Sequence, residues 1–243
     1  MQNDWLNTVL MALVGMGGGF VQRVSGFGLG IFVMLFLPYL TPEIAVAATI
    51  SCLFSCGTSS YNAVKYIKKV NFKLILPVLA ASMLILPVAV YFSAAMPQRT
   101  FEIILGSVLI ALSIYFLFFN ERIKMKKSVK NGVISGGLGG TLNGLFSTGG
   151  PPVVLYLSQV ASDNIEYFAG IQFYFCVTNI FATILRAING LVTREALITA
   201  AIGFAGCMIG DLAGSLVFNK LDGKKLKLII YIGMIVSGIL MIV

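Results

Sequence analysis

The chain has 243 residues, of which 58% are hydrophobic and only 11% are charged. A soluble surface draws on about 25–35% charged residues, so this composition excludes a soluble globular enzyme, a disordered chain and an ordinary nucleic-acid-binding protein. The 17 Lys and Arg outnumber the 9 Asp and Glu, there is no His, and the formal net charge is +8. The mean hydropathy of +0.95 predicts a polytopic membrane protein whose excess basic residues mark cytoplasmic loops.

Apolar runs follow one another along the whole chain. The first run follows Asp4 with no preceding Lys or Arg and no small-residue cleavage site, which predicts a retained helix and not a signal peptide. The runs lie near residues 5–22, 26–40, 44–64, 74–96, 101–119, 131–146, 151–161, 167–190, 196–218 and 227–243. Three of them, 26–40, 131–146 and 151–161, are shorter than the roughly 20 residues that cross a bilayer as a helix.

The two halves of the sequence resemble each other at a shift of 121 residues. The matched pairs are Gly15 and Gly136, Gly18 and Gly139, Gly19 and Gly140, Gly28 and Gly149, Gln22 and Asn143, Phe54 and Phe175, and Lys65 and Arg186. A fixed period of this kind indicates internal duplication. We therefore expect one membrane transport domain, residues 1–243, built from a first repeat of about 5–120 and a second of about 128–243.

Loop charges predict the topology. With five apolar runs per half and both termini outside, 13 of the 17 basic residues lie inside and only Arg99, Arg186 and Arg194 lie outside, with Arg23 within the membrane. Four crossings per half from an inside start would place fewer basic residues inside, so the first arrangement obeys the positive-inside rule better. The expected fold is an all-α polytopic membrane protein with two inverted-topology repeats of about five apolar segments each. The first two segments of each repeat are expected to be broken or re-entrant near the midplane, as in secondary transporters.

Two glycine-rich segments, 15–32 and 136–154, occupy matching places in the halves. The spacings Gly15–Gly19 and Gly136–Gly140 favour close helix packing. Further along, Ser147 and Thr148 are good N-cap residues and a proline follows Gly150, so a helix is predicted to begin there within the membrane. Residues 25–28 mark the corresponding start in the first half. Two helix starts that meet near the midplane would form an anion site.

Polar and glycine residues around these starts are the candidates for substrate binding. They are Gln22, Arg23, Ser25, Gly26, Gly28, Asn143, Ser147, Thr148, Gly149, Gly150, Gln172 and Asn179. Ser51, Thr58 and Asn62 lie on the corresponding helix of the first half. Amide and hydroxyl side chains also hold membrane helices together. Arg23 could pair with an anion or extend to the interface.

Three further charged residues are candidates for coupling or gating, because charges within a membrane are costly. Asp211 could carry a coupling proton, or it could cap or salt-bridge a neighbouring element. Lys65 and Arg186 could draw anions toward the pathway, or they could anchor helix ends.

The four cysteines lie inside apolar runs and are predicted to be buried, free thiols. Cys52 and Cys56 are four residues apart, a spacing that could hold a metal or a redox pair, but no His and no further Cys pair supports it. We therefore expect no metal, no cofactor and no catalytic residues.

The segments SGFGLG and GGLGGTLNGLFSTGGPP, with some 240 residues of apolar duplication, resemble the TauE/SafE sulfite-exporter family, also called the 4-toluene sulfonate uptake permease family. The first copy departs from the pattern, since no proline follows Gly28 and Arg23 lies in the break. The resemblance implies transport of a small sulfur-containing anion coupled to an ion gradient.

The sequence as a whole predicts a secondary transporter and not an enzyme, in a bacterial inner membrane. Sulfite, sulfoacetate or another organosulfonate would bind at the midplane with alternating access. The expected partners are the anion, a coupling proton or other ion, and membrane lipid, but no nucleic acid; a homodimer is left open. The alternatives are an anion channel of the same architecture and a thiol-relay membrane protein that uses Cys52 and Cys56.

Overall fold

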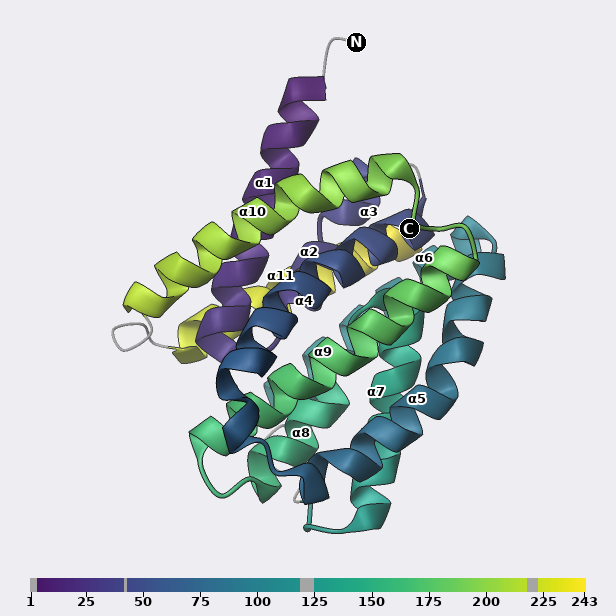
Figure 1. Cartoon of the computed structure of the whole chain (residues 1–243). Coiled ribbons are helices and arrows are strands. Elements are labelled where there is room, and N and C mark those ends of the chain that lie inside the picture. Colours follow the sequence, from purple (N-terminus) through teal and green to yellow (C-terminus); the bar gives the residue numbers. More distant parts are fainter. Residues whose placement is uncertain (1–3, 42, 119–124, 218–222) are drawn as a thin grey trace.

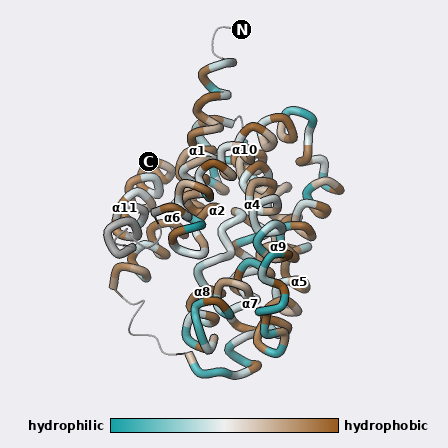
Figure 2. Tube along the Cα trace, turned by 60° about the vertical axis from the view of Figure 1, so that its left-hand side comes forward, coloured by the Kyte–Doolittle hydropathy of each residue, from teal (hydrophilic) through white to brown (hydrophobic). Residues whose placement is uncertain are grey.

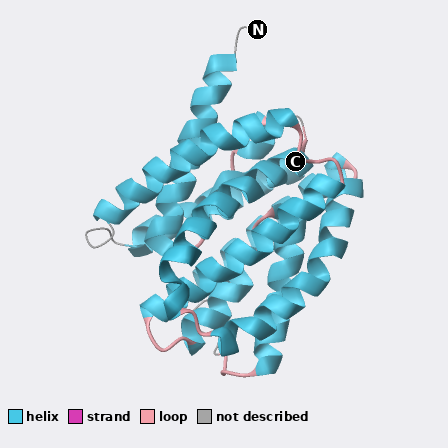
Figure 3. Cartoon of the chain, in the orientation of Figure 1, coloured by secondary structure: helices cyan, strands magenta, loops and turns pink. Residues whose placement is uncertain are grey.

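A computed structural model of the chain describes residues 4–41, 43–118, 125–217 and 223–243. Over these residues the chain forms helices joined by short loops, with no strand (Figure 3). The α-helices are α1 (Asp4–Ser25), α2 (Leu29–Met34), α3 (Leu37–Leu40), α4 (Ile44–Tyr66), α5 (Phe72–Ala95), α6 (Gln98–Phe118), α7 (Val129–Phe146), α8 (Gly150–Val160), α9 (Asn164–Ile188), α10 (Arg194–Val217) and α11 (Gly223–Ile242), and a short 3-10 turn, η1 (Ile67–Lys69), follows α4.

Six of the described helices are long and apolar enough to cross a membrane. These spans are Trp5–Ser25, Ile44–Lys69, Phe72–Ala95, Gln98–Phe118, Asn164–Ile188 and Arg194–Leu216. The helices follow the predicted apolar runs in chain order, with run 26–40 divided between α2 and α3. The prediction of an all-helical, multi-pass membrane protein is confirmed.

Large apolar side chains cover the outside of the bundle, and polar side chains lie within it. Leu84 is 78% exposed and Leu216 is 80% exposed, whereas Gln172, Asn143 and Arg186 are buried. In a soluble protein, large contiguous apolar surface is rare and polar residues lie outside. Lipid reverses that preference, so the outer faces of these helices suit a bilayer.

The long helices pack in pairs. Helix α1 crosses α10, and α5 lies beside α7 (Figure 1). Helix α6 packs against α11, and α4 against α9 at the centre of the bundle. The short helices α2 and α8 pack against α4 and α9 respectively. This arrangement brings both interrupted segments to the middle of the molecule.

Glycines let two of these pairs approach closely. A Cβ atom on Gly19 of α1 would lie 2.1 Å from the carbonyl oxygen of Cys207 on α10. A Cβ atom on Gly136 of α7 would lie 2.1 Å from the carbonyl oxygen of Val78 on α5. Any side chain there would collide with backbone, so the predicted packing role of the first glycine clusters is confirmed.

Gly136→Ala is expected to lower the free energy of unfolding by roughly 1–3 kcal/mol, because the added methyl group forces α5 and α7 apart. Gly137→Ala is the matched control, since a Cβ atom at Gly137 meets nothing within 4 Å and alanine favours a helix by about 1 kcal/mol over glycine. Thermal unfolding of the purified protein in detergent compares them. Equal melting temperatures for the two variants would contradict the packing role.

Basic residues gather at one end of the bundle. Lys68, Lys69 and Lys73 follow α4 and border an open cavity with Glu166 at the start of α9. Lys127, which precedes α7, lies within electrostatic range of Glu166. Figure 2 shows hydrophilic loops gathered at this lower end, whereas α1 begins and α11 ends toward the opposite end (Figures 1 and 2).

Candidate functional site

The two glycine-rich segments each interrupt a helix. After α1 ends at Ser25, Gly26 (φ 80°) and Gly28 (φ 96°) adopt the left-handed conformation, and α2 begins at the next residue. After α7 ends, Ser147 also has a positive φ of 56°, and α8 begins at Gly150. Left-handed residues end helices because they turn the chain away from the helix axis.

The two interruptions touch each other and α4. A Cβ atom on Gly30, in the first turn of α2, would lie 2.1 Å from the carbonyl oxygen of Ser147. The Ser147 hydroxyl donates to the carbonyl oxygen of Ala48 at 2.7 Å. Segments more than a hundred residues apart in the sequence therefore form one compact junction.

The predicted capping of α8 by Ser147 and Thr148 is wrong. Gly149 occupies the N-cap position, and no side chain caps the helix. Ser147 instead closes α7, because its N–H donates to the carbonyl oxygen of Asn143 and its hydroxyl bonds α4. The Thr148 hydroxyl is buried and has no partner among the described residues, so it is free to contact a ligand.

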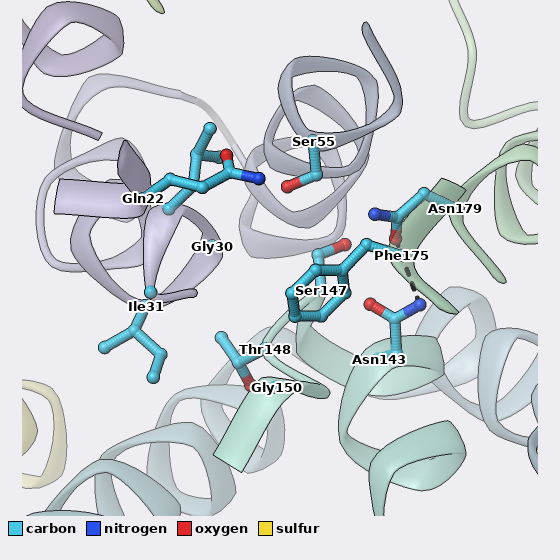
Figure 4. A pocket seen from close by; sticks show the side chains of 12 residues that line it. Gln22, Gly30, Ile31, Ser55, Asn143, Ser147, Thr148, Gly150, Phe175 and Asn179 are labelled. Carbon is cyan, nitrogen blue, oxygen red and sulfur yellow. Dashed lines mark hydrogen bonds between the residues drawn. The ribbon is translucent and has the colours of Figure 1, made fainter. Parts of the chain in front are cut away.

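A small cavity lies at the junction (Figure 4). Its lining residues are Gln22, Gly28, Leu29, Gly30, Ile31, Ser55, Asn143, Ser147, Thr148, Gly150, Phe175 and Asn179. The space open to the centre of a water-sized sphere is about 20 Å³, which suffices for one water molecule.

Side-chain amides around the cavity are held by hydrogen bonds. Gln22 donates to Gln172 at 3.1 Å and accepts from the Thr58 hydroxyl at 3.1 Å. Asn143 donates to the Oδ1 atom of Asn179 at 3.0 Å. Figure 4 shows the Asn179 amide nitrogen turned toward Ser55. In that orientation the Asn179 amide nitrogen can donate to a ligand in the cavity.

Backbone donors come mainly from the first turn of α2. The first helical hydrogen bond there joins the N–H of Phe32 to the carbonyl oxygen of Gly28, so the N–H groups of residues 29–31 have no partner within the helix. The first turn of α8 offers fewer donors, because Pro151 and Pro152 carry no N–H. Since α2 has only 6 residues, its free N–H groups matter more than its dipole.

The structure places the predicted binding residues in two groups. Those that line the cavity are Gln22, Gly28, Asn143, Ser147, Thr148, Gly150 and Asn179; those that do not are Arg23, Ser25, Gly26, Gly149 and Gln172. The Ser25 hydroxyl bonds the backbone of its own break, and Gln172 holds that break by donating to the carbonyl oxygen of Gly26 at 3.1 Å. The Arg23 side chain lies against Gly214 of α10.

Sequence reasoning missed Ser55 and Phe175 as cavity residues. Ser55 lies between Ser51 and Thr58 at helical spacing, so the polar face of 44–66 contained a signal for it. For Phe175, the sequence indicates only that it is the repeat counterpart of Phe54. Gly30 was also missed, because its need for a hydrogen in place of a side chain arises from a contact with the distant Ser147.

Lys65 and Arg186 have unlike environments. The Lys65 ammonium is exposed and lies over the rings of Tyr61 and Tyr66, at 5.8 and 5.5 Å from their centroids, as a helix-end residue does. Arg186 is completely buried, so it does not anchor a helix end at the surface.

Asp211 lies on α10 outside the cavity. It is partly buried and faces the charges of Arg23 and Lys65. These three residues come from α10, α1 and α4, so Asp211 lies where three helices meet.

All four cysteines are free. The Cys52 thiol contacts the carbonyl oxygen of Asn179 and the hydroxyl of Thr183, both at 3.5 Å. Within the part of the chain that the structure describes, no group of three or more His, Cys, Asp or Glu residues could hold a metal ion. The thiol-relay alternative stays a hypothesis.

A multi-pass helical bundle with a polar cavity between two interrupted helices is the architecture of a membrane transport protein. The family model of the sulfite exporter TauE/SafE matches residues 11–241, so the chain belongs to this family. It is 27% identical over 212 residues to the probable sulfite/organosulfonate exporter TauE of Cupriavidus necator, covering 84% of this chain and 81% of that protein. No solved structure matches the chain. Because the family consists of exporters, the protein is a multi-pass transporter and not an enzyme.

Proposed function

We propose that the protein is a secondary transporter of sulfite, sulfoacetate or another organosulfonate, with one anion site in the cavity between the starts of α2 and α8. The observation that carries this proposal is the junction itself. The α2 N–H groups that have no partner within the helix, the Asn179 amide and the free Thr148 hydroxyl border one cavity. Such donors suit the several oxygens of a sulfite or sulfonate group. The family and the name of the relative supply the substrate class.

The same pairs of contacts occur in both halves, which supports two inverted repeats. Gln22 bonds Thr58 in the first half, and Asn143 bonds Asn179 in the second; each residue has its counterpart 121 positions away. Among the helices, α1 packs against α10 just as α7 packs against α5. The short helices α2 and α8 then represent matching broken segments, as in transporters that move one repeat against the other.

The narrowness of the cavity favours alternating access over a channel. A space for one water molecule admits a multi-atom anion only after the junction opens. In this proposal the two repeats rock about the junction and expose the anion first to one side of the membrane and then to the other.

The distribution of charges supports one orientation in the membrane. The described basic residues after α4 and before α7 gather at one end, which the positive-inside rule assigns to the cytoplasm. Both termini then lie outside a bacterial inner membrane. A coupling proton or other ion, surrounding lipid and a homodimer belong to the same proposal.

Binding of a sulfur anion is expected to raise the melting temperature of the detergent-purified protein. At a concentration of a hundred times the dissociation constant, a ligand stabilises by roughly 2.7 kcal/mol. The panel compares sulfite, sulfate, thiosulfate, sulfoacetate, taurine, acetate, phosphate and chloride. Asn143→Ala should abolish the selective shift, because it removes an amide from the cavity wall and frees its partner.

Asn189→Ala is the control for this experiment. Asn189 is exposed at the end of α9 and donates only to its own helix, so its shift should equal that of the unchanged protein. If no sulfur anion stabilises the protein more than chloride does, the proposed substrate class is wrong.

A further inference from the structure

Arg186 is a buried positive charge that no described carboxylate neutralises; the ionisable side chain beside it is the Cys52 thiol. The Arg186 side chain is 0% exposed, and among the described residues no carboxylate lies within ion-pair distance of it. Its Nε atom has no hydrogen-bond partner there. An arginine keeps its charge in a protein, and an unpaired buried charge is strongly unfavourable. In a membrane protein, a buried charge of this kind points to a functional site.

The guanidinium contacts the end of α7 next to a residue that lines the cavity. Its Nη2 atom donates to the carbonyl oxygen of Gly144 at 2.7 Å. Gly144 follows Asn143, which lines the cavity. The carbonyl group that Arg186 contacts therefore belongs to the residue next to a cavity-lining residue of α7.

The second hydrogen bond of Arg186 also involves a residue next to the junction. The Nη1 atom donates to the Thr49 hydroxyl at 3.4 Å. Thr49 follows Ala48, whose carbonyl oxygen accepts from the cavity residue Ser147. Arg186 thus contacts α7 through the Gly144 carbonyl oxygen and α4 through the Thr49 hydroxyl, whereas no charged side chain lines the cavity itself.

We propose that Arg186 is the fixed countercharge of the transported anion and that it makes the site prefer dianions to monoanions. This proposal rests on the proposed anion site. Coulomb energy is proportional to the charge of the ligand, so a fixed positive charge stabilises a dianion twice as much as a monoanion. In a neutral cavity bordered by N–H groups alone, this selectivity would be smaller.

A purely structural role explains the contacts less well. The carbonyl oxygen of Gly144 requires only one donor, which a neutral side chain supplies, and Thr49 already donates to the carbonyl oxygen of Ala45 at 2.8 Å. Arginine brings five N–H donors and a permanent charge. The charge and the free Nε atom therefore exceed what helix packing needs.

The test compares methanesulfonate, a monoanion, with sulfoacetate, a dianion, by titration calorimetry on the full chain in detergent at neutral pH. In Arg186→Gln, affinity is expected to fall on the order of tenfold for methanesulfonate and a hundredfold for sulfoacetate. Arg186→Lys, which keeps the charge, should preserve most of the ratio between the two affinities. Equal losses for both anions, or no loss, would overturn the proposal.

A second pair of variants covers the case in which Arg186→Gln does not fold. Thr49→Asp places a carboxylate against the guanidinium and neutralises it in place, so it should reduce the sulfoacetate preference in the same way. Thr49→Val removes the hydroxyl without adding charge and should leave the preference unchanged. If the unchanged protein binds neither of these anions nor sulfite in the same titration, the proposed function fails. If it binds both sulfonates and Thr49→Asp behaves like Thr49→Val, only the role of Arg186 fails.

Discussion

Gly30→Ala is expected to reduce transport of labelled sulfite into proteoliposomes by about tenfold or more. The alanine Cβ atom would lie 2.1 Å from the carbonyl oxygen of Ser147. Real Cβ atoms do not approach backbone so closely, so α2 and the end of α7 must move apart. Their separation displaces the N–H groups of α2 from the cavity, and anion affinity falls with them.

Gly137→Ala serves as the control for Gly30→Ala, because it adds the same methyl group to a helix where nothing lies within 4 Å. Its transport should match that of the unchanged protein. The Gly30→Ala protein is first tested for folding by size-exclusion chromatography and thermal unfolding. A folded Gly30→Ala protein that transports sulfite at the normal rate would disprove that the junction forms the anion site.

Much of the fold could be predicted from the sequence because lipid imposes simple rules. Apolar length determines which segments become helices, and each predicted run corresponds to described helix. The prediction of close helix packing at the glycines was also correct. A spacing of four residues, as in Gly15–Gly19 and Gly136–Gly140, places both glycines on one helix face, where the missing side chains let another helix approach. In the structure, Gly203 of α10 and Val78 of α5 pack against these faces. The sequence predicts such close packing without identifying the partner helix.

The site was less predictable, because its geometry depends on partners distant in the sequence. Ser147 carries a strong local signal for capping, yet its hydroxyl bonds Ala48, 99 residues away. Gly30 has no local feature that indicates the contact with Ser147. Propensity describes a residue and its neighbours, whereas tertiary contacts decide which of two available hydrogen bonds a hydroxyl makes.

Arg186 shows that the sequence also does not predict whether a charged side chain is buried. Its position near a helix end, as the repeat counterpart of Lys65, is consistent with an interfacial anchor. Only the packing of α4, α7 and α9 around it shows that the side chain is buried while Lys65 is exposed. Two residues at equivalent places in the repeats therefore differ in environment.

Asp211→Asn is expected to abolish accumulation of sulfite driven by an ion gradient while exchange of sulfite across the membrane continues. Among the described acidic residues, Asp211 is the one within the inner part of a membrane-spanning helix. It faces Arg23 and Lys65 where α10 meets α1 and α4. A carboxylate there can take up and release a proton as these helices move, whereas an asparagine cannot.

Proteoliposomes with and without an imposed proton gradient provide the measurement, and Glu195→Gln provides the control. Glu195 is an exposed acid in the first turn of the same helix, so its loss should leave gradient dependence intact. Accumulation by Asp211→Asn at the normal level would remove this residue from the coupling. If the unchanged protein already moves sulfite equally with and without the gradient, no proton is coupled to transport. If the flux of sulfite also fails to saturate as its concentration rises, the channel alternative is favoured. The carboxylate would then serve only to balance the two basic side chains that face it.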